Sequence, residues 1–193
     1  MKAHRVKGLE PLAALGDNAE RIVLVRLDEL CAFMPRANDP EEIVALHDMR
    51  IAAKRLRYIL EVTAPCFGPY AHTAVEMVKD LQDLLGEIHD CDEQTPAVMA
   101  FLADVLLQDA QALTKAAGDA SDLSAKALRS APGRETYAGL AGLGVHLQAR
   151  RDLLFRRFQE LWLEYERKGF RARLEFAVAE RPGAITRDPG CPG

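Results

Sequence analysis

The fold of this chain is decided by one stretch, His47-Asp48-Met49-Arg50-Ile51-Ala52-Ala53-Lys54-Arg55-Leu56-Arg57-Tyr58-Ile59-Leu60. At about 100° per residue, its apolar side chains gather on one arc of a helix, which predicts packing against other helices. The opposite side carries a histidine and three cations within an arc of about 80°: His47, Arg50, Lys54 and Arg57. This basic ridge predicts either an anion site or an ordinary solvated helix face.

Outward from this stretch, apolar residues recur at helical spacing, and no segment shows the sustained alternation of a strand. The expected helices cover about 10–34, 40–64, 70–90, 96–117, 135–167 and 169–180. Two boundaries carry a cap followed by proline, Asp39-Pro40 and Thr95-Pro96, which is typical of helix starts. One-sided helices of this length pack as antiparallel bundles, so we predict an all-α fold of antiparallel helical bundles.

The composition sets the broad class. The chain has 193 residues and a formal net charge of -4, which fits one domain at residues 10–180. Small and polar residues at 118–134 predict a linker or a short helix, and the Pro- and Gly-rich residues 181–193 predict a flexible tail. No apolar run approaches the roughly 18 residues of a membrane span, so we expect a cytoplasmic protein that does not bind membranes.

Two other expected helices repeat the basic pattern. On the helix at 70–90, Lys79 and Gly86 share a polar face, and a glycine there indicates close approach of a ligand or another backbone. On the helix at 135–167, His146, Arg150 and Arg157 fall on one line. The alternative for this second line is a set of surface ion pairs with nearby glutamates. If the ridges face one another, they form a positive trough that a bound anion would stabilise.

The residue types indicate which anion would fit. Arginine and lysine donate charge-assisted hydrogen bonds to phosphate oxygens. Aromatic side chains for base stacking are limited to Tyr58 beside the first ridge, so nucleic acid is an unlikely partner. Phosphate-binding loops and Rossmann glycines are missing, and no catalytic residues or cofactor are predicted. The carboxylates around His89 (Glu87, Asp90, Asp92 and Glu93) could bind a metal, but we interpret them as a solvated helix end.

Two segments resemble the motifs of the CHAD family, the conserved histidine α-helical domain. The first is His47 to Tyr58; the second is Leu81-Gln82-Asp83-Leu84-Leu85-Gly86-Glu87-Ile88-His89-Asp90-Cys91-Asp92, with Lys79 just before it. The resemblance, which covers about 15 to 180, implies two pseudo-symmetric halves, about 10–117 and 135–180, with a basic groove between them.

The resemblance also implies non-enzymatic binding of inorganic polyphosphate, often at polyphosphate granules. The expected polyphosphate-binding residues are His47, Arg50, Lys54, Arg55, Arg57, Lys79, His146, Arg150 and Arg157. No metal ligand is assigned. Two other functions stay open: a metal-binding or phosphohydrolase-accessory domain, and a helical scaffold for a protein partner. The oligomeric state and the preferred phosphate chain length do not follow from the sequence.

Overall fold

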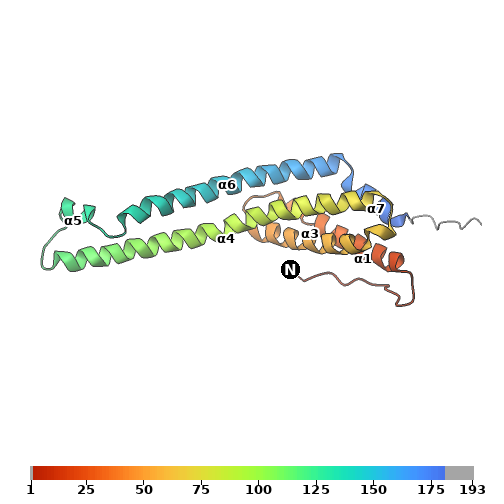
Figure 1. Cartoon of the computed structure of the whole chain (residues 1–193), viewed down its shortest axis with the longest axis horizontal. Coiled ribbons are helices and arrows are strands. Elements are labelled where there is room, and N and C mark those ends of the chain that lie inside the picture. The colour runs from red at the N-terminus through yellow and green to blue at the C-terminus, as the bar shows by residue number, and fades with distance from the viewer. Residues whose placement is uncertain (1, 181–193) are drawn as a thin grey trace, which may run out of the picture. The chain divides into compact units, whose positions relative to one another are not determined.

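A computed structural model describes residues 2–180 (Figure 1). Every regular element among these residues is a helix, which confirms the all-α prediction. The helices are α1 Leu15–Cys31, α2 Met34–Ala37, α3 Ile43–Thr63, η1 Ala64–Cys66, α4 Tyr70–Ala117, α5 Ala125–Arg129, α6 Arg134–Arg167 and α7 Phe170–Ala179. The predicted tail at 181–193 lies outside the described residues.

The chain divides into two compact units. Among the described residues, the first unit comprises residues 2–86 and 157–180, and the second unit comprises residues 87–156. Helices α4 and α6 each contribute to both units. The predicted pseudo-symmetric halves, with their boundary at 118–134, follow a different division of the chain and stay a prediction.

The first unit is built around the apolar arc of α3. Met49, Leu56 and Leu60 are fully buried there; α1 packs against α3, and α7 packs against α1 (Figure 1). The final turns of α6 are attached by a hydrogen bond of 2.7 Å from the Tyr165 hydroxyl to the backbone oxygen of Met77 in α4. The arc that predicted helix packing in the sequence is therefore the core of this unit.

The second unit is a hairpin of two long helical segments, the end of α4 and the start of α6, joined through α5. Asp109 connects the two segments near the end of the hairpin. Its carboxylate accepts hydrogen bonds from the Gly133 N–H at 2.9 Å and from the Tyr137 hydroxyl. Residues 118–134, predicted as a linker or a short helix, contain α5, and the Ser124 side chain caps its start by accepting the Ala127 N–H at 3.1 Å.

The predicted boundary at Thr95-Pro96 is wrong. Helix α4 continues through Pro96 as one element, so the expected helices at 70–90 and 96–117 are a single helix. A proline in a helix interior costs about 3 kcal/mol, and tertiary contacts offset it here. Asp92 before the proline and Asp109 after it both bind residues of α6, which holds the two segments in line.

The start of α3 also differs from the prediction. The helix begins at Ile43, three residues beyond the expected proline start, and Glu42 occupies the N-cap position without a side-chain cap. Asp39 instead accepts the Glu41 N–H at 2.9 Å and forms a turn outside the helix. The cap signal therefore marked a turn, while the basic ridge remained on the helix as predicted.

Candidate functional site

The basic ridge lies on α3, opposite the arc that fills the core. Lys54 is exposed, whereas His47, Arg50 and Arg57 are partly buried. A solvated face would leave all of these side chains in water, so the ridge differs from that alternative. Arg55, the remaining predicted residue of this stretch, is also partly buried and lies on a neighbouring side of the helix.

Arg50 connects the two sequence motifs. A Cβ atom built on Gly86 of α4 would lie 3.4 Å from Nε of Arg50. The group next to the glycine is therefore a guanidinium group rather than a backbone. Without a side chain at Gly86, the arginine can lie flat across α4.

Two polar atoms near this crossing make no hydrogen bond with the described residues. Nε of Arg50 is buried without such a partner, and so is Oε1 of Gln82, which lies one helical turn before Gly86 on α4. A buried polar group without a hydrogen bond costs about 1–3 kcal/mol. Nε of Arg50 can therefore donate a hydrogen bond to a ligand, and Oε1 of Gln82 can accept one.

Lys79 belongs to the same face of α4. It lies two helical turns before Gly86, and its side chain is exposed. No ion pair of Lys79 occurs among the described residues. Arg50 therefore lies near the helix face of α4 that carries Lys79, and the predicted grouping of these two cations stays a prediction.

Arg57 and Lys54 flank the one aromatic ring of the ridge. The Tyr58 ring centroid lies 5.0 Å from the guanidinium carbon of Arg57 and 5.7 Å from Nζ of Lys54. Arg57 also lies 3.1 Å from the carboxylate of Glu61, one turn away, and its side chain is 18% exposed. These contacts orient the two cations along the surface of α3.

The second predicted line of cations is divided by the structure. His146 and Arg150 lie in the second unit, and Arg157 begins the part of α6 that belongs to the first. All three side chains are exposed. Arg150 donates to Glu87 at 2.5 Å, so the charge of this predicted ligand is already compensated. The ion-pair alternative therefore holds for Arg150, although its partner is Glu87 rather than a glutamate of α6.

The ion pair of Arg151 was not predicted from the sequence. Its Nε lies 2.6 Å from Oδ1 of Asp92, and both side chains are nearly buried, at 9% and 6% exposure. Asp92 and Glu87 are two of the four carboxylates around His89, so half of that acidic cluster pairs with arginines of α6. Among residues 2–180, no group of three or more His, Cys, Asp or Glu side chains is arranged to hold a metal ion.

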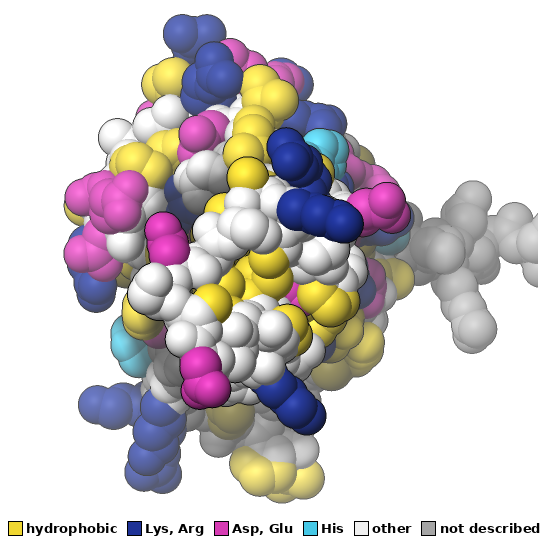
Figure 2. Space-filling view, turned by 90° about the vertical axis from the view of Figure 1, so that its left-hand side faces the viewer, with side chains coloured by type: hydrophobic (Ala, Val, Ile, Leu, Met, Phe, Trp, Pro, Cys, Tyr) yellow, Lys and Arg dark blue, Asp and Glu magenta, His cyan; other side chains and the backbone are white. Residues whose placement is uncertain are grey.

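The end of the second unit around α5 has no continuous basic surface. Figure 2 looks onto this end and shows Lys and Arg side chains interspersed with acidic and hydrophobic ones. A polyanion needs several cations in a row, and this face does not present them. The α3 ridge with the Lys79 face of α4 is the denser group of cations among the predicted residues.

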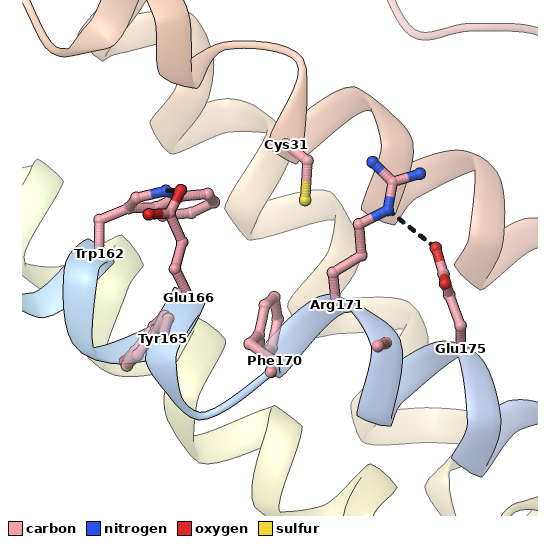
Figure 3. Close-up of a pocket in the computed structure, with 9 residues that line it drawn as sticks. Cys31, Trp162, Tyr165, Glu166, Phe170, Arg171 and Glu175 are labelled. Carbon is pink, nitrogen blue, oxygen red and sulfur yellow. Dashed lines mark hydrogen bonds and ion pairs between the residues drawn. The ribbon is translucent and has the colours of Figure 1, made fainter.

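A separate pocket of about 300 Å³ lies in the first unit, between the end of α1 and the turn from α6 to α7 (Figure 3). Its walls are largely apolar. Its polar groups bind one another: Trp162 donates to Glu166, and Arg171 to Glu175, each at 2.8 Å. Burial raises the pKa of Cys31, at its rim, to about 11. None of the predicted cations lines this pocket, which does not suit a polyanion.

Comparison with known proteins agrees with the motifs. A family model described as CHAD domain matches residues 3–98. This range contains α1, α2, α3 and the first part of α4, and therefore every predicted cation of the α3 ridge together with Lys79. His146, Arg150 and Arg157 lie outside it. No curated protein and no solved structure matches the chain.

Proposed function

We propose that this chain, which belongs to the CHAD family through residues 3–98, captures inorganic polyphosphate on the basic surface of α3 and α4. The family binds polyphosphate through a helical domain that is not itself catalytic. In this chain the proposed ligands are His47, Arg50, Lys54, Arg55, Arg57 and Lys79. Binding is electrostatic capture without chemical turnover, in the cytoplasm and at polyphosphate granules.

The observation that carries the proposal is the position of Arg50 across Gly86. This contact between α3 and the face of α4 that carries Lys79 supports a binding surface shared by cations of both motifs. Nε of Arg50 has no hydrogen-bond partner among the described residues, and a phosphate oxygen would supply one. Hydrogen bonds to charged groups contribute about 1.5–3 kcal/mol each, so a few of them hold a multiply charged chain.

His146, Arg150 and Arg157 are proposed as secondary ligands. Arg150 would have to leave Glu87 to bind phosphate, and both side chains of that pair are almost half exposed, at 46% and 45%. Exposed ion pairs contribute about 0–1 kcal/mol, so the exchange is inexpensive. His146 and Arg157 are exposed and therefore accessible to a polyanion.

A titration with long-chain polyphosphate tests the proposal. Affinity should fall with salt by about 0.7 decade per decade of salt for each phosphate contact, by analogy with single-stranded nucleic acids. The double variant Arg50→Glu with Lys54→Glu should lose binding at least tenfold while the far-UV circular dichroism stays unchanged. The matched control, Lys126→Glu with Arg129→Glu on α5, has the same change in net charge and should bind as the unmodified chain does.

Other results would favour the two alternative functions. Binding that requires a divalent metal, or release of phosphate during incubation, would support the function of a metal-binding or phosphohydrolase-accessory domain. Equal loss of affinity in both double variants would mean that net charge, rather than the α3 surface, governs binding. An absence of polyphosphate binding in a folded protein would leave a scaffold for a protein partner.

A further inference from the structure

The second unit has an apolar flank that the unit itself does not cover. Within residues 87–156 there are two long helical segments and short α5, so the hairpin has no third layer. Contrary to the expectation from the sequence, α4 contains an 18-residue window that is apolar enough to cross a membrane by length and composition, and only 6% of this window is buried. Apolar helix surface of this extent indicates a missing partner.

On α4 the flank is a stripe with heptad spacing. Met99, Ala103, Leu106 and Ala110 recur at intervals of about 3.5 residues and so stay on one side of the helix. All four are exposed, Met99 at 50% and Leu106 at 46%. The stripe contains no charged residue, and large and small side chains alternate along it.

On α6 the same flank carries Ala141 and Val145. The Met99 sulfur lies 3.3 Å from a Cβ atom built on Gly144, which shows where the stripe meets α6. Ala141 lies one turn from Gly144, and Val145, 70% exposed, follows Ala141 by one turn. The opposite flank of the hairpin carries His146 and Arg150 by the same helical phase. On α4 this flank is therefore apolar and uncharged.

We propose that the occupant of the apolar flank is a second copy of this chain, so that two hairpins form an antiparallel four-helix bundle. The order of the side chains favours this partner. A two-fold axis midway between Ala103 and Leu106 places each of them opposite the other in the partner copy. The same axis places Met99 opposite Ala110, so every large side chain of the stripe meets a small one.

Charge and area agree with a self-association. The uncharged α4 stripe can meet its own copy without like-charge repulsion. From Asp92 to Ala117 the helix is about 38 Å long at 1.5 Å per residue, and two adjacent helices are about 20 Å wide. The product, about 750 Å², is close to the roughly 800 Å² that each partner buries in a standard interface.

Sedimentation equilibrium of the full chain tests the inference. The mass should rise from 21.3 kDa toward twice that value as the protein concentration increases from about 1 to about 100 µM. A dimer dissociation constant in this interval is at the weak end for interfaces of this size. Leu106→Glu should weaken the dimer at least tenfold with unchanged circular dichroism. Phe176→Glu is the matched control, because this apolar side chain on α7 is also exposed, at 68%, but lies in the first unit.

A mixing experiment tests the two-fold register. Ala103→Arg should be monomeric alone, because two arginines cannot meet the leucines of the partner. Mixed with Leu106→Glu, it should restore a heterodimer, since the new arginine and glutamate face each other. Both substitutions are at exposed positions, so folding should survive them. A monomer at all concentrations, a dimer that Leu106→Glu leaves intact, or a monomer that sediments with phosphatidylglycerol vesicles would each overturn the inference.

Discussion

Arg151 and Asp92 form an ion pair that water hardly reaches. Nε of Arg151 lies 2.6 Å from Oδ1 of Asp92, and the side chains are 9% and 6% exposed. Within the second unit, the pair joins the middle of α6 to the segment of α4 just before Pro96. It therefore fixes the pairing of the two long helical segments at a point where the proline would otherwise favour a break.

Substituting one partner of this pair should destabilise the protein strongly. Arg151→Leu leaves the carboxylate of Asp92 buried without its cation, which costs about 3–5 kcal/mol. Adding Asp92→Leu should recover about 2 kcal/mol or more, because the isolated charge is then removed. Urea unfolding measures both. Lys168→Leu, at an exposed pair with Glu164, is the control and should cost about 0.5 kcal/mol or less; an equally small loss for Arg151→Leu would refute the assigned role.

The neighbouring pair of Arg150 and Glu87 should behave differently. Both side chains are almost half exposed, so Glu87→Gln should change stability by less than about 1 kcal/mol. The same substitution frees the Arg150 guanidinium for a phosphate. We expect polyphosphate affinity to increase roughly two- to fivefold, the equivalent of that pairing energy. Unchanged affinity by calorimetric titration would exclude Arg150 from the binding surface.

A substitution at Gly86 can change helix stability without changing polyphosphate binding. Gly86→Ala should raise the free energy of unfolding by up to about 1 kcal/mol, because alanine is the better helix former. The new methyl group would lie 3.4 Å from Nε of Arg50, an ordinary contact that requires no movement. Thermal unfolding checks the increase, and polyphosphate affinity should change little.

A larger side chain at the same position should impair binding. Gly86→Leu must displace the Arg50 guanidinium, and the loss of one charge-assisted hydrogen bond corresponds to at least a tenfold lower affinity. Gly139→Leu is the matched control, because a Cβ atom built on this α6 glycine has nothing within 4 Å. A similar loss of affinity in both variants would show that the effect does not depend on Arg50.

The predictions from sequence were confirmed for features that depend on residues within a single helix. The arc of α3 and its basic ridge depend on residues within a few turns of each other, and periodicity reports them directly. The glycine on the polar face of α4 lies next to Arg50, but a Cβ atom there would meet Nε at 3.4 Å, an ordinary contact, so the predicted close approach stays a prediction. Its partner, Arg50, was not identifiable from spacing because that contact depends on how two helices pack.

The missed features depend on contacts between distant residues. Thr95-Pro96 has the local pattern of a helix start, and only the binding of Asp92 and Asp109 to α6 explains why α4 continues. The sequence predicted a solvated helix end for the acidic cluster at 87–93, because its arginine partners are about sixty residues away along the chain. Opposite charge patterns on two expected helices were the one signal that could have suggested these pairs.

A final prediction concerns Glu29, a buried carboxylate of α1 that holds the N-terminal segment. It accepts the backbone N–H of His4 and lies 2.6 Å from Nη1 of Arg26, while Arg26 also donates to the His4 oxygen at 3.0 Å. Burial alone would raise the pKa of Glu29. The hydrogen bonds from Arg26 and His4 outweigh burial, so this pKa lies below its ordinary value of 4.5.

The sign of the pH dependence follows from that lowered pKa. Glu29 stabilises the folded state above pH 4.5, and this stabilisation is lost as the pH falls through its folded-state pKa. Glu29→Gln should cost about 1.5–3 kcal/mol at neutral pH, because a buried hydrogen-bonded charge is lost, and should flatten the decline of stability below pH 4.5. Urea unfolding between neutral and acidic pH measures both effects, with Glu93→Gln at an exposed position as the control. Parallel acid profiles for the unmodified chain and Glu29→Gln would show that the carboxylate does not hold the N-terminal segment through its charge.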